Sequence, residues 1–298
     1  MLHLKPLSKG FGLEASGIDI SEPLPDEAFA EIEDAFFDGQ VLSIPHQRLT
    51  PPEFVAFARR FGPPEPHVID QFHHPDDPNI LILSNVVIDG EPQGLADAGT
   101  YFHTDYSYLD VPARATILYS IEVPEVGGDT LFANQYAAYD DLPAAMKRKV
   151  ESLVAVHHYG NRHVGEGKAR TAASMLTDEQ KAKMPLITHP IVRRHPVTGR
   201  RALYAVSGSS YGIVGMPEDE AVALLDELAA HATQKKYLLQ YEYGVGDVVI
   251  WDNASLLHSA TLTDPDSART LWRITVKEPV SLGHAEAVLA PTFVRRPT

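Results

Sequence analysis

Residues 101–105 of the chain read Tyr-Phe-His-Thr-Asp and bring two potential metal ligands close together in the sequence. In an extended strand alternate side chains point to the same face, so we expect His103 and Asp105 to project into one cavity. A second histidine, His258, comes late in the chain, after a predicted strand and turn at 247–253. Two histidines and one carboxylate form the facial triad that suits Fe(II) and leaves positions open for substrate and oxygen.

These three residues alone do not define a metal site, because a His-x-Asp spacing also arises by chance and a histidine also occurs as a hydrogen-bonded surface residue. Further residues at linked positions strengthen the interpretation. Thr130 directly follows Gly-Gly-Asp at 127–129, and Arg269 and Arg273 follow His258. The two arginines are four residues apart in a predicted strand, so their guanidinium groups are expected on the same face of a sheet, at different depths.

The composition is that of an ordinary globular protein: of 298 residues, 44% are hydrophobic and 22% are charged. The formal net charge of −15 argues against nucleic-acid and anionic-membrane partners, since binding phosphates requires clustered Lys and Arg. The chain has no cysteine, which excludes disulfides, thiolate metal sites and cysteine nucleophiles. The N-terminal residues lack the apolar run of a signal peptide, and no segment is apolar enough for a membrane span, so we expect a cytoplasmic protein.

Many short predicted strands, with a few helices before and between them, indicate a mainly β protein with helical decoration. We expect a double-stranded β-helix, or jelly-roll, core, because such a roll brings segments that are distant in the sequence together. No internal repeat and no linker divides the chain, so residues 1–298 are interpreted as a single domain. Three polar loops, at 63–78, 86–100 and 157–175, are candidates for lids over the cavity.

The combined motifs resemble the taurine dioxygenase and 2,4-dichlorophenoxyacetate dioxygenase (TauD/TfdA) family of Fe(II)/2-oxoglutarate-dependent oxygenases. The motifs that carry the resemblance are Phe-His-Thr-Asp at 102–105, Gly-Gly-Asp-Thr-Leu-Phe at 127–132, Trp-Asp-Asn at 251–253 with His258, and Arg269 with Arg273. The likeness covers most of the chain.

The resemblance implies roles for individual residues. His103, Asp105 and His258 correspond to the iron ligands, and Thr130 and Arg269 to the pair that holds the distal carboxylate of 2-oxoglutarate. An arginine and a hydroxyl satisfy a buried carboxylate better than a lysine does.

The substrate end of the site is implied in the same way. Arg273 corresponds to the residue that meets the anionic end of the substrate, with a structural ion pair as the alternative. His67 matches a family position that hydrogen-bonds the substrate anion, although it lies in a loop of variable length. Tyr106 and Tyr108 follow the ligands and are candidates for the pocket wall, with only one of the two expected to line the site.

One position departs from the taurine branch, where an asparagine precedes the first iron histidine by four residues. Here that position is Gly99, so taurine itself is not the expected substrate. Asn85 and the loop at 86–94 are closer to the aryloxyacetate branch, which makes Asn85 a further candidate substrate contact. The carboxylate of Asp105 argues against the halogenating relatives, which need an open ligand position for chloride.

The implied reaction uses Fe(II), O2 and 2-oxoglutarate to hydroxylate a small organic acid next to its heteroatom, with succinate and CO2 as co-products. The acid is an aryloxyalkanoate, an alkylsulfonate or a sulfate ester, and we expect a homo-oligomer, a dimer or a tetramer. Three alternatives remain: a related oxygenase acting on an amino-acid-like acid, a zinc or manganese hydrolase or isomerase, and a non-catalytic small-molecule sensor.

Overall fold

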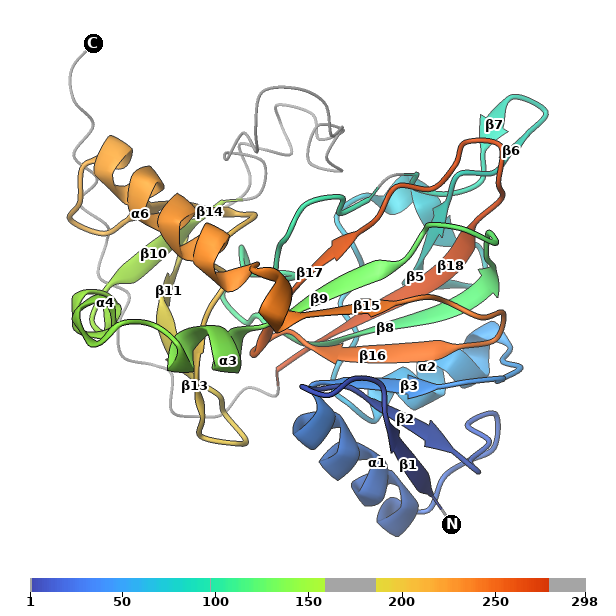
Figure 1. Ribbon diagram of the computed structural model, residues 1–298. Helices are drawn as coiled ribbons and strands as arrows, with labels where there is room; N and C mark the ends of the chain where they lie inside the picture. Colours follow the sequence, from blue (N-terminus) through green and yellow to red (C-terminus); the bar gives the residue numbers. More distant parts are fainter. Residues whose placement is uncertain (1, 97, 159–185, 279–298) are drawn as a thin grey trace.

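A computed structural model describes residues 2–96, 98–158 and 186–278 of the chain. Two β-sheets that face each other form the body of the molecule, and helices pack on the outside (Figure 1). In chain order the elements are β1 (His3–Pro6), β2 (Leu13–Ser16), α1 (Asp26–Gly39), β3 (Val41–Ile44), α2 (Pro51–Arg59), η1 (Asp70–Phe72), β4 (His73–His74), β5 (Asp77–Ser84), β6 (Val87–Ile88), β7 (Glu91–Pro92), β8 (Ala113–Glu122), β9 (Thr130–Asn134), α3 (Gln135–Asp140), α4 (Ala144–Val150), β10 (Val154–His157), β11 (Ile187–Pro190), β12 (Val192–Arg194), β13 (Arg201–Leu203), β14 (Ser210–Ile213), α6 (Glu218–Ala232), η3 (Lys235–Tyr237), β15 (Leu238–Tyr241), β16 (Val248–Asp252), β17 (Leu256–Ala260) and β18 (Thr270–Lys277).

The larger sheet has the strand order β1-β2-β3-β16-β8-β18-β5-β4, and the smaller sheet has the order β15-β9-β17. All neighbouring pairs are antiparallel except β2 and β3, which are parallel. The central strand β8 is buried along most of its length, because its two faces are covered by different layers. Neighbours such as β8, β16 and β18 come from distant parts of the chain, as the sequence predicts for a jelly roll.

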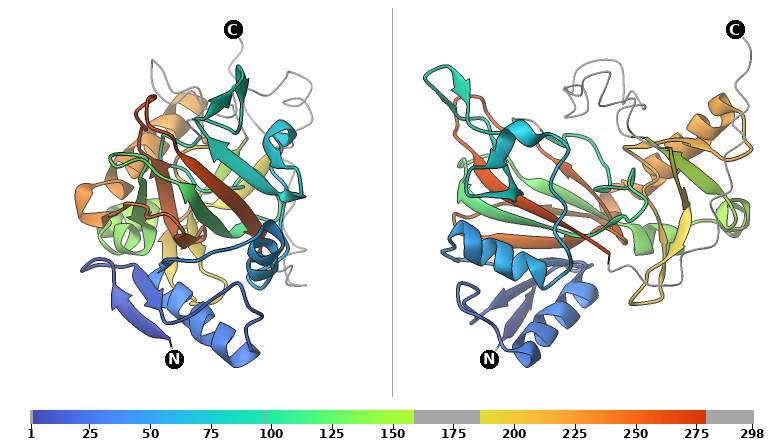
Figure 2. Two further views of the ribbon diagram at one scale, coloured as in Figure 1. Left: turned by 90° about the vertical axis from the view of Figure 1, so that its right-hand side faces the viewer. Right: turned by 180° about the vertical axis from the view of Figure 1, so that it is seen from behind.

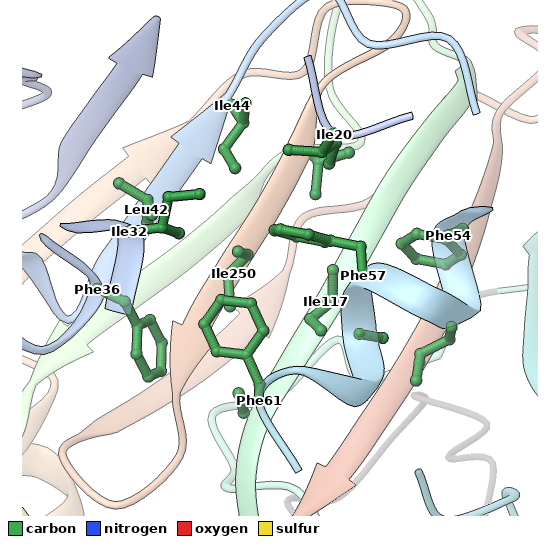
Figure 3. Close-up of a cluster of buried hydrophobic side chains, with 14 of the residues drawn as sticks. Ile20, Ile32, Phe36, Leu42, Ile44, Phe54, Phe57, Phe61, Ile117 and Ile250 are labelled. Atoms are coloured by element: carbon green, nitrogen blue, oxygen red, sulfur yellow. The ribbon is translucent and has the colours of Figure 1, made fainter. Parts of the chain in front are cut away.

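Helices α1 and α2 cover the outer face of the larger sheet. Both form where the sequence places apolar residues at helical spacing, and α2 begins where the Thr50 N–H donates to the Glu53 side chain. The apolar sides of the helices meet the sheet in an aromatic-rich core, in which Phe61 contacts Phe57 edge to face (Figure 3). Phe61 also contacts Phe29 edge to face. This layer makes the larger sheet a rigid wall.

A second core fills the space between the two sheets. Its buried members include Leu118 from β8, Phe132 from β9, Trp251 from β16 and Leu271 next to the start of β18. Tyr106 and Tyr108 belong to the same cluster, so the segment that follows the predicted metal ligands closes one end of this core. The active-site candidates therefore lie beside the apolar core that joins the two sheets.

A lobe made of β10, β11, β13, β14, α3, α4 and α6 lies beside the double sheet (Figure 1), and the view from behind in Figure 2 shows it on the opposite flank from the β6–β7 hairpin. It has its own apolar core, which includes Leu203, Ile213 and Leu225. The expected lid at 157–175 belongs to this region, but its residues from 159 onward lie outside the described residues. No helix in the described ranges is long and apolar enough to span a membrane.

Candidate active site

The three residues predicted as metal ligands meet in the structure. His103 Nε2 lies 3.5 Å from Asp105 Oδ1, and His258 Nε2 lies 3.5 Å from Asp105 Oδ2. One possible ligand atom from each residue lies within 4.8 Å of the other two. Within the ranges 2–96, 98–158 and 186–278, no second group of three such side chains is close enough to hold a metal ion.

The prediction of a strand over 101–105 is wrong, but the side chains of His103 and Asp105 still point toward each other, as expected. The stretch makes a single bridge, in which the His103 N–H donates to the His258 carbonyl at 2.9 Å and the His258 N–H donates back at 2.8 Å. The strand cannot continue because Tyr106 adopts a left-handed backbone (φ 52°) and the chain turns there. The bridge itself places the late histidine of β17 next to the early one.

The donor set fits a divalent metal ion. His103 Nδ1 lies 2.8 Å from the Tyr101 carbonyl, which only accepts hydrogen bonds, so Nδ1 carries the proton and Nε2 presents its lone pair to Asp105. A lone pair facing a carboxylate oxygen at 3.5 Å leaves room for a cation between them. Metal–ligand bonds of about 2.0–2.2 Å hold neighbouring ligand atoms about 3 Å apart, close to the observed spacing.

Two further side chains hold the carboxylate of Asp105. Thr116 in β8 donates a 2.6 Å hydrogen bond to Oδ2, and Arg273 places a guanidinium nitrogen 2.7 Å from Oδ1. Asn253 accepts from the Asp105 N–H at 3.3 Å and donates to the Thr116 hydroxyl at 3.0 Å. Burial opposes ionisation, but the positive charge of Arg273 holds the pKa of Asp105 well below its usual value, so it is a carboxylate at neutral pH.

Thr130 and Arg269, the pair predicted to hold the distal carboxylate of 2-oxoglutarate, line the same cavity as the three metal-ligand candidates. Thr130 begins β9 and Arg269 directly precedes β18. The Arg269 Nε donates to the Gly128 carbonyl at 2.9 Å, which fixes the plane of the guanidinium. Gly128 has a positive φ of 73°, and a Cβ there would lie 2.8 Å from the Arg269 Nε, so this position of the Gly-Gly-Asp-Thr motif requires glycine.

A tyrosine that the sequence analysis did not single out touches both members of this pair. The Tyr243 hydroxyl lies 2.8 Å from the Thr130 hydroxyl, and the Arg269 guanidinium lies 5.8 Å from the centre of the Tyr243 ring. Burial raises the pKa of Tyr243 to about 12, so it is protonated at neutral pH.

The cavity that holds the metal-ligand candidates is also lined by Arg273 and His67. Its walls combine apolar side chains with a few polar ones. The lining residues besides those already named include Leu83, Leu95, Leu118, Tyr101, Ser209 and Trp251. A charged end, an apolar middle and a metal site next to the charge suit a small, partly apolar acid.

His67 is buried at the charged end of the cavity. Burial, and then the positive charge of Arg273, lower the pKa of His67 to about 3, so its ring is neutral. The Ile69 N–H donates to His67 Nδ1 at 3.2 Å, which leaves the proton on Nε2. This end of the cavity therefore combines the Arg273 guanidinium, which is paired with Asp105, with a neutral imidazole.

Tyr106 and Tyr108 both line the cavity, so the expectation that only one of them would do so is wrong. Their rings meet edge to face with centroids 5.8 Å apart, and the Tyr106 hydroxyl donates to the Glu65 carbonyl at 3.1 Å. The left-handed backbone at Tyr106 breaks the alternation on which the expectation rested.

Asn85 and Gly99 make contacts in the structure that the sequence did not predict. Asn85 accepts from the Arg269 N–H at 2.9 Å and donates to the Ser267 carbonyl at 2.9 Å, and it borders a neighbouring pocket. Gly99 has φ 73°, and a Cβ there would lie 2.7 Å from His103 Cε1. The absence of a side chain at Gly99 thus leaves room for the imidazole of His103, a metal-ligand candidate.

The residues missed at the sequence level are Thr116, Asn253 as a support of Asp105, Tyr243, Tyr101 and Ser209. Asn253 carried a usable signal, since it belongs to the Trp-Asp-Asn motif. Thr116 and Tyr243 lie within or beside predicted strands and have no motif of their own, so only the pairing of β8 with β16 and of β15 with β9 reveals them.

A double β-sheet fold with a buried two-histidine, one-carboxylate site defines a metal-dependent enzyme of the facial-triad class. Residues 3–275 match the model of the family described as "Taurine catabolism dioxygenase TauD, TfdA family". The chain belongs to this family and is a 2-oxoglutarate-dependent dioxygenase, an oxidoreductase. Membership decides against the hydrolase and the sensor that the sequence left open.

Similar proteins of known activity and structure agree with this assignment. The (S)-phenoxypropionate/alpha-ketoglutarate-dioxygenase of Sphingobium herbicidovorans is 31% identical over 271 residues, covering 90% of this chain and 92% of its own. The alpha-ketoglutarate-dependent 2,4-dichlorophenoxyacetate dioxygenase of Cupriavidus pinatubonensis is 32% identical over 280 residues, covering 91% and 96%. The protein in the structure titled "Crystal structure of AAD-2 in complex with Mn(II) and N-oxalylglycine" is 28% identical in sequence. The two structures superpose with a TM-score of 0.78, covering 94% of this chain and 98% of that one.

Proposed function

We propose that the protein uses Fe(II) and O2, with 2-oxoglutarate, to hydroxylate an aryloxyalkanoic acid at the carbon that carries both the acid group and the ether oxygen. The iron is held by His103, Asp105 and His258, and it supplies the oxidising chemistry when bound. The distal carboxylate of 2-oxoglutarate is held by Thr130 and Arg269. The observation that carries the proposal is the position of Arg273: it lines the cavity beside the metal-ligand candidates, with a guanidinium nitrogen 2.7 Å from Asp105 Oδ1, so a bound acid group would share this arginine with Asp105.

That contact limits where the substrate is oxidised. An acid group held by Arg273 and His67 cannot be more than a few bonds from the metal, so the carbon next to the acid group is the reactive one. Hydroxylation of this carbon in an aryloxyacetate gives a hemiacetal, which breaks into a phenol and glyoxylate, while 2-oxoglutarate becomes succinate and CO2. The aryl ring then lies along Leu83, Leu95 and the Tyr106–Tyr108 pair, whose apolar surface gains from covering it.

The same site chemistry accepts a sulfonate or a sulfate ester at Arg273, and an amino-acid-like acid remains the alternative within the family. A panel of acids distinguishes them: phenoxyacetate, the two enantiomers of 2-phenoxypropionate, an alkyl sulfate, an alkylsulfonate and phenylalanine. Each is assayed for succinate formed above the rate without substrate, and for release of phenol, aldehyde, sulfate or sulfite.

The proposal predicts the largest stimulation, together with equimolar phenol, for an aryloxy acid. Stimulation by phenylalanine alone would overturn the substrate class and favour the amino-acid alternative. We further expect one domain over residues 1–298, a homo-oligomer and a cytoplasmic location; sedimentation analysis of the full chain tests the assembly.

A further inference from the structure

Tyr243 lies at the junction of the two residues proposed to hold the distal carboxylate of 2-oxoglutarate. Its hydroxyl is 2.8 Å from the Thr130 hydroxyl, and its ring lies against the Arg269 guanidinium. Thr130 comes from β9, Arg269 from the start of β18 and Tyr243 from the turn between β15 and β16. The Tyr243 side chain therefore contacts both Thr130 and Arg269, which come from different sheets.

The turn that carries Tyr243 is rigidly held. Asp247 accepts hydrogen bonds from the Gly244 N–H at 2.7 Å and from the Tyr241 hydroxyl at 2.8 Å. The Ser120 hydroxyl of β8 donates to the Gly244 carbonyl, which ties the turn to the larger sheet. The Tyr241 and Tyr243 rings meet edge to face with centroids 5.0 Å apart. Tyr243 is thus fixed in place before any ligand arrives, which is the arrangement expected of a positioning residue.

The chemistry of the hydroxyl pair assigns a direction to its hydrogen bond. A carboxylate only accepts, so Thr130 must donate its single hydroxyl proton to bind it. Thr130 must then accept from Tyr243, which in turn must keep its own proton. The buried phenol does so at neutral pH, since burial raises its pKa.

We propose that Tyr243 is a positioning residue of the co-substrate site: its O–H donates to Thr130, which directs the Thr130 O–H at the distal carboxylate, while its ring supports Arg269. This inference rests on the proposed role of Thr130 and Arg269. It predicts that Tyr243 contributes to recognising the distal carboxylate and contributes nothing to the keto-acid end.

The test compares two ligands that differ only at the distal end. Calorimetry on Mn(II)-loaded protein without oxygen measures the affinities for 2-oxoglutarate and for 2-oxopentanoate, which lacks the second carboxylate. In Tyr243→Phe we expect about a threefold to tenfold weaker binding of 2-oxoglutarate, the effect of one lost hydrogen bond, and unchanged binding of 2-oxopentanoate. Tyr237→Phe is the matched control, because its hydroxyl bonds Asp141 instead and both affinities should stay those of the wild type.

A double-mutant cycle checks that Tyr243 acts through Thr130. Adding Tyr243→Phe to Thr130→Val should cost little further affinity, whereas additive losses would overturn the directed pair. Equal weakening of both ligands in Tyr243→Phe would show a general structural role and also overturn the inference, as would wild-type affinity for both. If wild-type protein itself does not prefer 2-oxoglutarate over 2-oxopentanoate, the proposed clamp fails, and Tyr243 loses its role with it.

Discussion

The hydroxyl of Thr116 is predicted to set the metal affinity of the site from behind the ligand carboxylate. It donates to Asp105 Oδ2 at 2.6 Å and accepts from the Asn253 side chain at 3.0 Å, and Thr116 is fully buried. Thr116→Val keeps the branched shape but removes these two hydrogen bonds and a third, 3.3 Å contact with the Thr275 hydroxyl. The Asp105 carboxylate then keeps only Arg273 of the two side chains that hold it, and a buried Asn253 N–H is left without its partner.

Two magnitudes follow. Losing a partner of a metal-ligating side chain typically weakens metal binding by about 10–100-fold. The buried amide and carboxylate that remain also lower the free energy of unfolding by about 1–3 kcal/mol. Thr116→Val should therefore bind Mn(II) at least about tenfold more weakly than the wild type, measured by competition with a chelator of known affinity, and should also unfold at a lower urea concentration.

Ser120→Ala provides the control, because Ser120 is a buried hydroxyl residue of the same strand whose hydrogen bonds serve the 244–247 turn. It should lose stability with little change in metal affinity. Thr116 does not set the metal affinity if Thr116→Val binds Mn(II) as tightly as the wild type. The same conclusion follows if both variants lose metal affinity in proportion to their lost stability.

Three further predictions concern the remaining parts of the site and fold. Arg273→Gln should raise the KM for the acid substrate by about 10–100-fold, since a hydrogen bond to a charged group is lost, and should also weaken metal binding, because Asp105 loses its 2.7 Å ion-pair partner. Steady-state kinetics at saturating metal, with both substrates varied, separates the two effects. Gly99→Ala should weaken metal binding, because the new methyl group would lie 2.7 Å from His103 Cε1; unchanged chelator competition would contradict the packing argument. Burial lowers the pKa of His189 from 6.5 to about 4, so neutral His189 stabilises the fold above pH 6.5 and this contribution is lost as the pH falls toward 4. Between pH 7 and pH 5 the free energy of unfolding of the metal-free wild type should therefore fall by about 2 kcal/mol more than that of His189→Gln, as measured by urea unfolding.

The convergence of the three metal-ligand candidates could be predicted from the sequence because part of the pattern is local. A His-x-Asp pair needs only one short stretch to bring two ligands together, and the third ligand is marked by the Trp-Asp-Asn turn that precedes it. The prediction survived even though the local structure was wrong: residues 101–105 form a single bridge, and the side chains of His103 and Asp105 still converge.

The supporting residues could not be predicted because they are defined by strand pairing. Thr116 reaches Asp105 from β8, and Tyr243 reaches Thr130 from the turn after β15; neither neighbour is visible in the sequence around it. Asn85 illustrates the same limit, since its amide holds the backbone of Arg269. The contact of Asn85 with substrate remains a prediction, while its hydrogen bond to the Arg269 backbone is seen in the structure.

The most direct test of the proposed site is the visible absorption of the anaerobic protein with Fe(II) and 2-oxoglutarate. A keto acid chelated to iron in a facial triad gives a weak metal-to-ligand charge-transfer band. We expect this band in the wild type and, at the same sub-saturating 2-oxoglutarate concentration, a much weaker band in Arg269→Ala, because that variant lacks the cation for the distal carboxylate. No band in folded, iron-loaded wild-type protein would contradict the assignment of His103, Asp105 and His258 as a site for iron and 2-oxoglutarate.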